Sequence, residues 1–307
     1  VFGQFSMQPD DTLKLTFGFR STNDKKDAVG GTKVQIRPPC GGPFCWVNVG
    51  SQSYSPKDSW SSSTYRVGVD KYINDDRMVY ASMSTGYRAG GFNFGVSSAE
   101  SYDPEELTAF EVGSKNRFND GRMQLNATVF YYDYTDLQVF QVVDQTIVIR
   151  NASEADISGA ELEFVAALSD RLRVDASLGI LEAEYKKFIL PSNLFLDASG
   201  EPTDIDVSGN SLINAPKWSG HVGVEYEFAA SRHGTFTVRA QTYITDDIYL
   251  RALNLDPFDL QDGYATWDAK LMWKSADNRW FGEAFINNWS DEDVITNQEV
   301  TDSGIYF

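Results

Sequence analysis

The chain has 307 residues, of which 42% are hydrophobic and 14% aromatic, and its formal charge is −18. This aromatic content excludes a disordered chain, and no run of about 18 apolar residues is present that could form a membrane-spanning helix. The excess of 44 acidic over 26 basic residues argues against nucleic-acid binding, because nucleic acid attracts basic surfaces. Composition alone would therefore fit an acidic soluble protein.

The N-terminus and the two cysteines carry limited information. The chain begins at Val1 without a signal segment, so we expect either a processed protein or a chain that starts within a longer one. Cys40 and Cys45 lie in the turn-rich segment RPPCGGPFC, which predicts a small loop disulfide and an oxidising compartment. A metal site there would need further ligands, and no histidine lies nearby.

The dominant hydrophobic period along the chain is two, which is typical of β-strands. In TLKLTFGFR, for example, Leu15 and Phe17 alternate with Lys14, Thr16 and Gly18, and Arg20 falls on the polar side. Comparable alternation predicts about twelve strands in all. They are expected at residues 1–8, 12–20, 63–73, 77–88, 106–118, 124–132, 158–168, 171–180, 217–228, 234–248, 263–274 and 279–288.

Short and long connections alternate between these predicted strands. The short turns are 8–11, 74–77, 119–122, 169–171, 229–234 and 275–279. The long connections are 21–62, 93–105, 141–156, 188–216, 251–262 and 290 onward. In an up-and-down meander, all short turns then lie at one end and all long loops at the other, as in an outer-membrane barrel.

A soluble β-sandwich is the main alternative fold. It would explain the alternation, but it explains neither the asymmetry of the connections nor strands of about ten residues. In a barrel, lipid covers the apolar side and a wet lumen solvates the polar side. Aromatic residues near strand ends also fit an interfacial girdle. These are Trp218, Trp267, Trp273, Tyr131 and Phe228. The sequence therefore predicts an all-β, antiparallel, up-and-down transmembrane β-barrel.

Several longer segments resemble the C-terminal barrel of TonB-dependent outer-membrane receptors. They include RMVYASMSTGYRAGGFN, ELTAFEVGSKNRFNDGRMQLNATVFYYDYTDLQV and SGNSLINAPKWSGHVGVEYEF, in the order found in that family. The resemblance runs from Val1 to about Val294, and it implies a barrel of about 22 strands filled by an N-terminal plug. We therefore expect residues 1–307 to be the C-terminal part of such a barrel, without the plug, the first strands and the last strand.

The resemblance also implies a function and partners. It implies active uptake of a scarce ligand across the bacterial outer membrane, by default a ferric siderophore, energised by TonB acting on the plug. Outer-membrane lipid and lipopolysaccharide are the other expected partners. A passive porin-like channel or structural barrel subunit is one alternative, and a secreted all-β binding module is another. The acidic net charge slightly favours cationic or neutral ligands at the loops.

Enzyme chemistry, metals and cofactors are not expected. His221 alternates to the polar side of a strand and His233 lies in a short turn, and neither has a nucleophile motif such as GxSxG nearby. The acidic loop with Asp197 and Asp206 has Pro202 where an EF-hand needs glycine. We therefore expect a solvated acidic loop rather than a calcium site.

Candidate ligand contacts lie where strands reach the predicted long loops. Arg88 is an expected anchor for an anion or carboxylate, and Phe92 and Asn93 follow it in GYRAGGFNFG. A second group comes from YYDYTDLQVFQ. It consists of Tyr132, Tyr134, Phe140 and Gln141. The aromatic members would equally fit an interfacial girdle.

Overall fold

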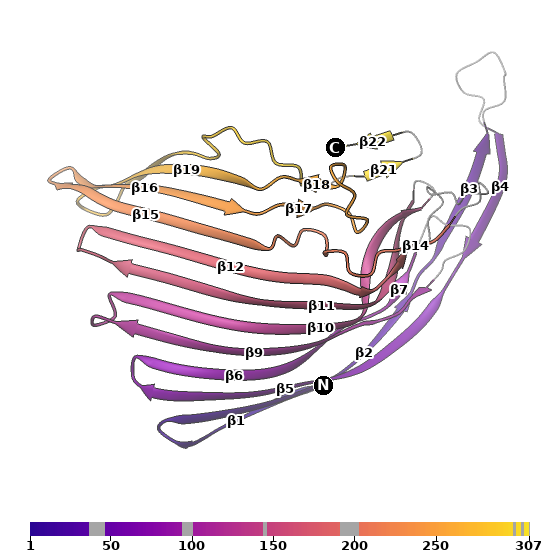
Figure 1. Ribbon diagram of the computed structural model, residues 1–307, viewed down its shortest axis with the longest axis horizontal. Helices are drawn as coiled ribbons and strands as arrows, with labels where there is room; N and C mark the ends of the chain where they lie inside the picture. Colours follow the sequence, from indigo (N-terminus) through magenta and orange to yellow (C-terminus); the bar gives the residue numbers. More distant parts are fainter. Residues whose placement is uncertain are drawn as a thin grey trace, which may run out of the picture.

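The computed structural model describes residues 1–36, 47–93, 101–143, 146–190, 203–296, 299–301 and 304–306. A single antiparallel sheet of 12 strands dominates these residues, which confirms the predicted fold class (Figure 1). Its strands in spatial order are β1 (Phe2–Asp10), β2 (Leu13–Asp27), β5 (Lys57–Asn74), β6 (Arg77–Arg88), β9 (Glu105–Phe118), β10 (Met123–Val143), β11 (Thr146–Ala167), β12 (Leu172–Lys187), β15 (Trp218–Ser231), β16 (Gly234–Thr245), β19 (Tyr264–Lys274) and β20 (Phe281–Ile286).

Five small hairpins interrupt the order without entering the main sheet. They are β3 (Gly30–Ile36) with β4 (Val47–Tyr54), β7 (Gly91–Phe92) with β8 (Ser101–Tyr102), β13 (Ile189–Leu190) with β14 (Ile205–Asp206), β17 (Ile248–Tyr249) with β18 (Leu260–Gln261), and β21 (Glu299–Thr301) with β22 (Gly304–Tyr306). Among the described residues, no helix is long and apolar enough to cross a membrane.

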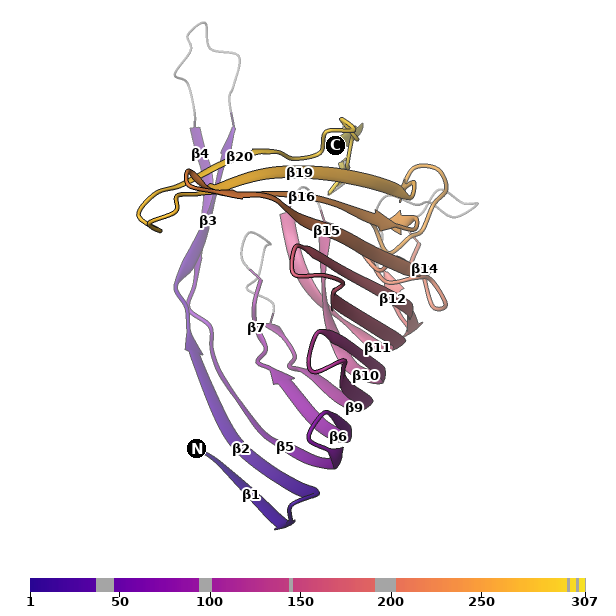
Figure 2. The same ribbon diagram turned by 90° about the vertical axis from the view of Figure 1, so that its left-hand side faces the viewer.

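The two ends of the sheet differ as the connection lengths predict. The short turns gather at one end, here called the turn end, and the small hairpins gather at the other, the loop end (Figure 1). The sheet itself is a curved wall with an open side (Figure 2). Antiparallel pairing of consecutive long strands produces this segregation, because each strand reverses the direction of the one before it.

The turns at the turn end are stabilised by short polar side chains. Asp10 Oδ1 accepts the backbone N–H of Thr12 (2.7 Å), and Asn74 Oδ1 accepts that of Asp76 (3.0 Å). Between β9 and β10, Asn119 and Asp120 have φ angles of 54° and 53°, the conformation that tight hairpin turns require. Local sequence therefore determines these reversals.

The predicted connection 141–156 is wrong in most of its length. The β10–β11 ladder continues to the pair Val143 and Thr146, so these strands project beyond their neighbours at the loop end. At the base of this extension the adjacent residues Gln138 and Val139 are both buried (7% and 8% exposed), and Val148 on β11 is 3% exposed, so apolar and polar residues no longer alternate between a covered and an open face. From the sequence alone, a segment without regular alternation of apolar and polar residues is predicted to be a loop. The predicted connection 21–62 is likewise shortened, by β2 and β5.

One face of the main sheet is apolar and remains exposed. Directly paired residues form an unbroken apolar row across nine neighbouring strands. Its members are Met7, Leu15, Val69, Ala81, Val112, Val129, Ala160, Ile180 and Trp218. Val112 and Val129 are 54% and 56% exposed, so nothing within the described residues buries this face. We call it the apolar face and the opposite one the polar face.

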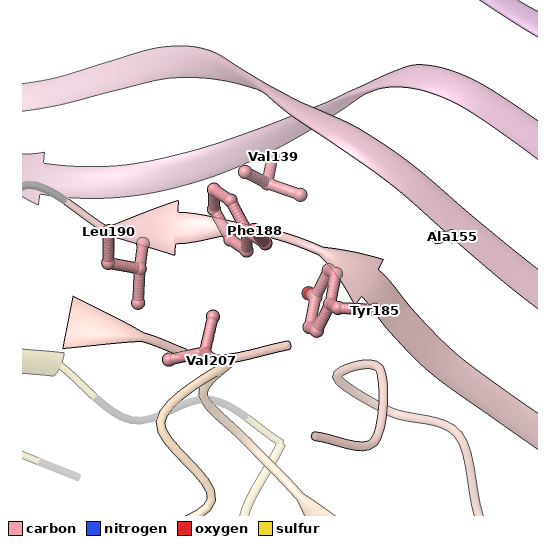
Figure 3. Close-up of a cluster of buried hydrophobic side chains, with 6 residues drawn as sticks. All are labelled: Val139, Ala155, Tyr185, Phe188, Leu190 and Val207. Carbon is pink, nitrogen blue, oxygen red and sulfur yellow. The ribbon is translucent and has the colours of Figure 1, made fainter. Parts of the chain in front are cut away.

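A hydrophobic cluster at the loop end joins the β10–β11 extension to the connection between β12 and β15 (Figure 3). Its members are Val139, Ala155, Tyr185, Phe188, Leu190 and Val207. The aromatic rings of Tyr185 and Phe188 lie 5.1 Å apart, and Tyr185 is only 1% exposed. This cluster thus forms where the loop-end parts of β10, β11 and β12 meet the connection that follows β12.

Candidate functional site

The polar face is the concave face of the wall. Tyr80 on β6 and Thr128 on β10 are hydrogen-bonded through their hydroxyls (2.9 Å) although β9 lies between them. Arg239 on β16 likewise donates to both carboxylate oxygens of Asp175 on β12 across β15 (2.7 and 2.9 Å). The inside of a curved sheet brings side chains two strands apart closer together, so these two bridges place the polar face on the hollow side.

Glycines on the intervening strands make both bridges possible. A Cβ atom on Gly113 would lie 2.6 Å from Tyr80 Oη, and one on Gly223 would lie 2.7 Å from Asp175 Oδ2. Any larger residue would displace the bridging side chain. On the concave face, hydrogen bonds thus join strands that are not direct neighbours, and each depends on a glycine in the strand that lies between them.

At the loop end, the β10–β11 extension is held between two connections. The hydrophobic cluster covers one side. On the other side, the Gln138 amide donates to the carbonyls of Ala89 (3.2 Å) and Asp103 (3.0 Å). The Asn93 side chain donates to Ile149 O (2.8 Å) and accepts from Ile149 N (2.7 Å), as a neighbouring strand would. These buried amides fasten the β6–β9 connection onto the extension.

We expect Asn93→Ala to loosen this attachment, because it removes both hydrogen bonds to Ile149. Each bond contributes about 1 kcal/mol, so local opening should become easier by about 1–3 kcal/mol. Amide hydrogen exchange at Ile149 would measure it as faster exchange than in the wild type. Arg88→Ala is the matched control, since the exposed Arg88 side chain makes no such contact among the described residues. Unchanged exchange in Asn93→Ala would contradict the attachment.

The connections that follow β12 and β16 are also tied to one another. Asn210 Nδ2 donates to the carbonyls of Ala252 (2.8 Å) and Leu253 (3.1 Å), and the Ser211 N–H donates to Asn254 Oδ1 (2.7 Å). In the same region the Ser208 hydroxyl donates to Asp206, which lowers the pKa of that carboxyl. These two connections are therefore packed together at the loop end.

The sequence-predicted contacts Arg88, Phe92 and Asn93 lie close together in the chain but in different surroundings. Arg88 is exposed at the loop end of β6. The Phe92 ring lies 5.9 Å from that of Trp60, and Lys26 Nζ lies 5.6 Å above the same Trp60 ring. Asn93 is buried and bonded to Ile149, so its amide supports the β6–β9 connection.

The members of the second predicted group, which all belong to β10, lie in different surroundings. Tyr132 Oη donates to Glu111 Oε1 (2.9 Å) on the polar face, and Tyr134 packs against the hydrophobic cluster. Phe140 lies further out and is 64% exposed. The side chain of Gln141 lies outside the described residues. So do Cys40, Cys45 and Asp197, so the disulfide stays a prediction and most of the acidic loop is not described.

A row of paired residues on the polar face includes Arg66, which was not among the contacts predicted from the sequence. It runs through Gly18, Arg66, Ser84, Ala109, Tyr132, Ile157 and Ala183. Arg20 lies two residues beyond Gly18 on the same face of β2. Both arginines alternate with outward aromatic residues in the sequence, which was the signal that could have identified them.

The chemical groups on this surface are mainly hydrogen-bonding groups. Among the described residues, no group of three or more His, Cys, Asp or Glu side chains could hold a metal ion. The polar face instead offers guanidinium, hydroxyl and phenol groups on a rigid sheet, with small residues between them. These features are typical of the polar, inward-facing side of an antiparallel barrel.

The class of protein follows from the comparison with known families. Residues 1–289 match the family described as TonB dependent receptor-like, beta-barrel. The chain therefore belongs to the TonB-dependent receptor β-barrel family, as its segments suggested. Its relatives are receptors and transporters and not enzymes.

Curated relatives include two siderophore or metal receptors. The chain is 25% identical over 253 residues to "Probable TonB-dependent siderophore receptor PiuA" of Acinetobacter baumannii, covering 80% of this chain and 32% of that protein. It is 25% identical over 193 residues to "Metal-pseudopaline receptor CntO" of Pseudomonas aeruginosa, covering 62% and 24%. The chain thus spans about a third or less of these relatives.

Solved structures agree on the fold. The ferric yersiniabactin uptake receptor FyuA from Yersinia pestis aligns with a TM-score of 0.75 at 19% identity, over 99% of this chain and 42% of that one. The siderophore receptor PiuA from A. baumannii aligns with a TM-score of 0.69 at 22% identity, over 95% and 38%. The wall described here therefore corresponds to part of a receptor barrel.

Proposed function

We propose that this chain is the C-terminal part of the barrel of an outer-membrane receptor that imports a ferric siderophore with energy from TonB. The family match across residues 1–289 carries the proposal. The names of the relatives, which include siderophore and metal receptors, support the ligand class.

The two faces of the sheet support a place in a bilayer. The exposed apolar face would contact lipid, because an uncovered surface of this kind is costly in water. The polar concave face would line a wet or plugged lumen. Lipopolysaccharide would meet the apolar face at its loop end, beyond the hydrocarbon layer.

The sheet edges support a larger barrel. β1 and β20 each pair on one side only within the described residues, and open edges are unfavourable in lipid. Strands outside this chain would close the barrel, and a plug within it would connect the ligand site to TonB. Ligand binding at the loop end and a pull on the plug would then open a path along the polar face.

Uptake by living cells tests this function. Cells expressing the complete gene product under iron limitation should accumulate radioactive iron supplied as a ferric tris-catecholate or ferric tris-hydroxamate complex. We expect uptake of at least one complex to disappear when TonB is deleted, because passive diffusion cannot concentrate a scarce ligand. The vector-only strain is the control.

Three results would contradict the proposal. Uptake that persists at the same rate without TonB would indicate a passive channel. Steady ion conductance of the purified complete protein in planar bilayers, without TonB, would indicate the same. Extraction into buffer without detergent would instead favour a secreted binding module.

A further inference from the structure

We propose that the part of the polar face nearer the loop end binds an anionic metal chelate selectively. The guanidinium groups of Arg20, Arg66 and Arg88 would contact one side of the chelate and the phenol of Tyr132 the other. This inference rests on the receptor function proposed above and specifies the charge of its ligand. It departs from the preference that the acidic net charge of −18 would suggest.

The strand register places Arg66 and Tyr132 in one row across four neighbouring strands. Arg66 pairs with Ser84, Ser84 with Ala109, and Ala109 with Tyr132, so these residues form consecutive steps of a single row. Three strand intervals of about 4.8 Å separate the backbones of Arg66 and Tyr132 by about 14 Å. Only small side chains lie between them. This spacing suits a bulky chelate that touches both sides rather than a single small ion.

Two more guanidinium groups flank the row toward the loop end. Arg20 lies two residues beyond Gly18, the direct partner of Arg66. Arg88 lies four residues beyond Ser84 on the same face of β6. Arginine side chains are long and flexible enough for their charged ends to approach a common ligand.

These arginines have no acidic partner in the described part of the chain. Arg20, Arg66 and Arg88 are all exposed, and the one contact found is from Arg20 Nε to Thr22 Oγ1 (3.1 Å). Glu105, the register partner of Arg88, instead accepts the backbone N–H of Gln138 (2.8 Å). By contrast, Arg239 and Arg251 are paired with Asp175 and Asp259. The charge of the first three groups is therefore available to a ligand.

The chemistry of the row indicates which anions would fit. Guanidinium forks bind paired oxygens in a plane, as in carboxylates and catecholates, more specifically than a point charge does. Tyr132 is held by its bond to Glu111 and by stacking on Phe130 (4.9 Å between ring centroids). A fixed phenol ring offers an apolar surface to an aromatic ligand ring. An anionic chelate with planar oxygen donors satisfies both sides.

Binding of two probes that differ mainly in charge tests the inference. The purified complete protein in detergent would be titrated with the trianionic ferric tris-catecholate and with the neutral ferric tris-hydroxamate, by fluorescence quenching. We expect tighter binding of the tris-catecholate, and its affinity should fall as salt rises while that of the neutral chelate stays constant. Arg66→Gln should weaken tris-catecholate binding on the order of 10- to 100-fold.

Two further variants separate charge from fold. Arg171→Gln makes the same change in charge in the exposed turn between β11 and β12, and should leave both affinities unchanged. Arg66→Lys keeps the charge but loses the fork, so its affinity should lie between those of the wild type and Arg66→Gln.

The outcomes distinguish this inference from the proposed function. If the wild type takes up the neutral chelate in a TonB-dependent manner and Arg66→Gln binds the tris-catecholate as the wild type does, the inference is wrong while the receptor function stands. If neither chelate binds and no TonB-dependent uptake occurs, both are wrong. A loss of tris-catecholate binding in Arg66→Gln, but not in Arg171→Gln, would support it.

Discussion

Replacement of Gly234 by alanine should sharply reduce the amount of folded barrel. Gly234 begins β16 with a φ angle of 115°, which other residues rarely adopt. A Cβ atom there would also lie 2.8 Å from Ser275 Cα and would overlap the Lys274 carbonyl. These neighbours are backbone atoms, so no side-chain rotation relieves the overlap. We expect a loss of about 3 kcal/mol or more, from backbone strain and overpacking together.

Gly121 provides a matched control for the Gly234 variant. It also lies in a turn at the turn end, with a φ angle of 80°, but nothing lies within 4 Å of its Cβ position. Gly121→Ala should therefore cost only the backbone strain, about 1 kcal/mol. Thermal unfolding and the heat-dependent shift of the complete protein in gel electrophoresis would report both. Equal effects of the two variants would refute the role of the close approach.

Removal of Asp259 should unfold the connection between β16 and β19. Asp259 is fully buried, and its Oδ1 accepts from Arg251 Nε (2.6 Å) while its Oδ2 accepts from Leu255 N (3.0 Å). Its backbone also bonds to Leu250 and Leu255 (2.8 Å each). Breaking a buried ion pair from one side costs about 3–5 kcal/mol, because the remaining charge loses its partner. In Asp259→Ala we expect the backbone amides of Leu250 and Leu255 to lose most of their protection from hydrogen exchange.

The main sheet should tolerate the Asp259 variant, because the connection opens locally while the strand ladders stay intact. Asp262→Ala is the control in the same connection, since that exposed carboxylate bonds to none of the described residues. The double variant Asp259→Ala with Arg251→Met should recover part of the protection, because the unpaired charge is also removed. Full protection in Asp259→Ala alone would show that the ion pair does not hold the connection.

Most of the sheet could be predicted from the sequence because strand signals are local. Alternation in segments such as TLKLTFGFR and QLNATVFYY assigns each residue to a face without knowledge of its neighbours in space. Turn residues such as Asn119 and Asp120 mark the reversals for the same reason. The exception is the β10–β11 extension, at whose base the adjacent residues Gln138 and Val139 are both buried, so the period on which the prediction depends is lost.

The contact residues were less predictable than the strands. Asn93 lies next to Phe92 in the sequence, yet its amide is bonded to Ile149, 56 positions away. Tyr132 and Tyr134 lie on one face of β10, yet one is bonded to Glu111 and the other packs against the hydrophobic cluster. Sequence placed these residues near the loop end, but their partners come from distant strands.

The sequence by itself determined the number of strands in the main sheet, the face on which side chains lie in the regularly alternating segments, and the end at which the long connections gather. These properties follow from a period of two residues and from local turn chemistry. Only the tertiary structure decided that Arg66 and Tyr132 share one row, and that Arg239 reaches Asp175 over Gly223. Such neighbours depend on the registers of several strands and on the curvature of the sheet, which no local pattern encodes.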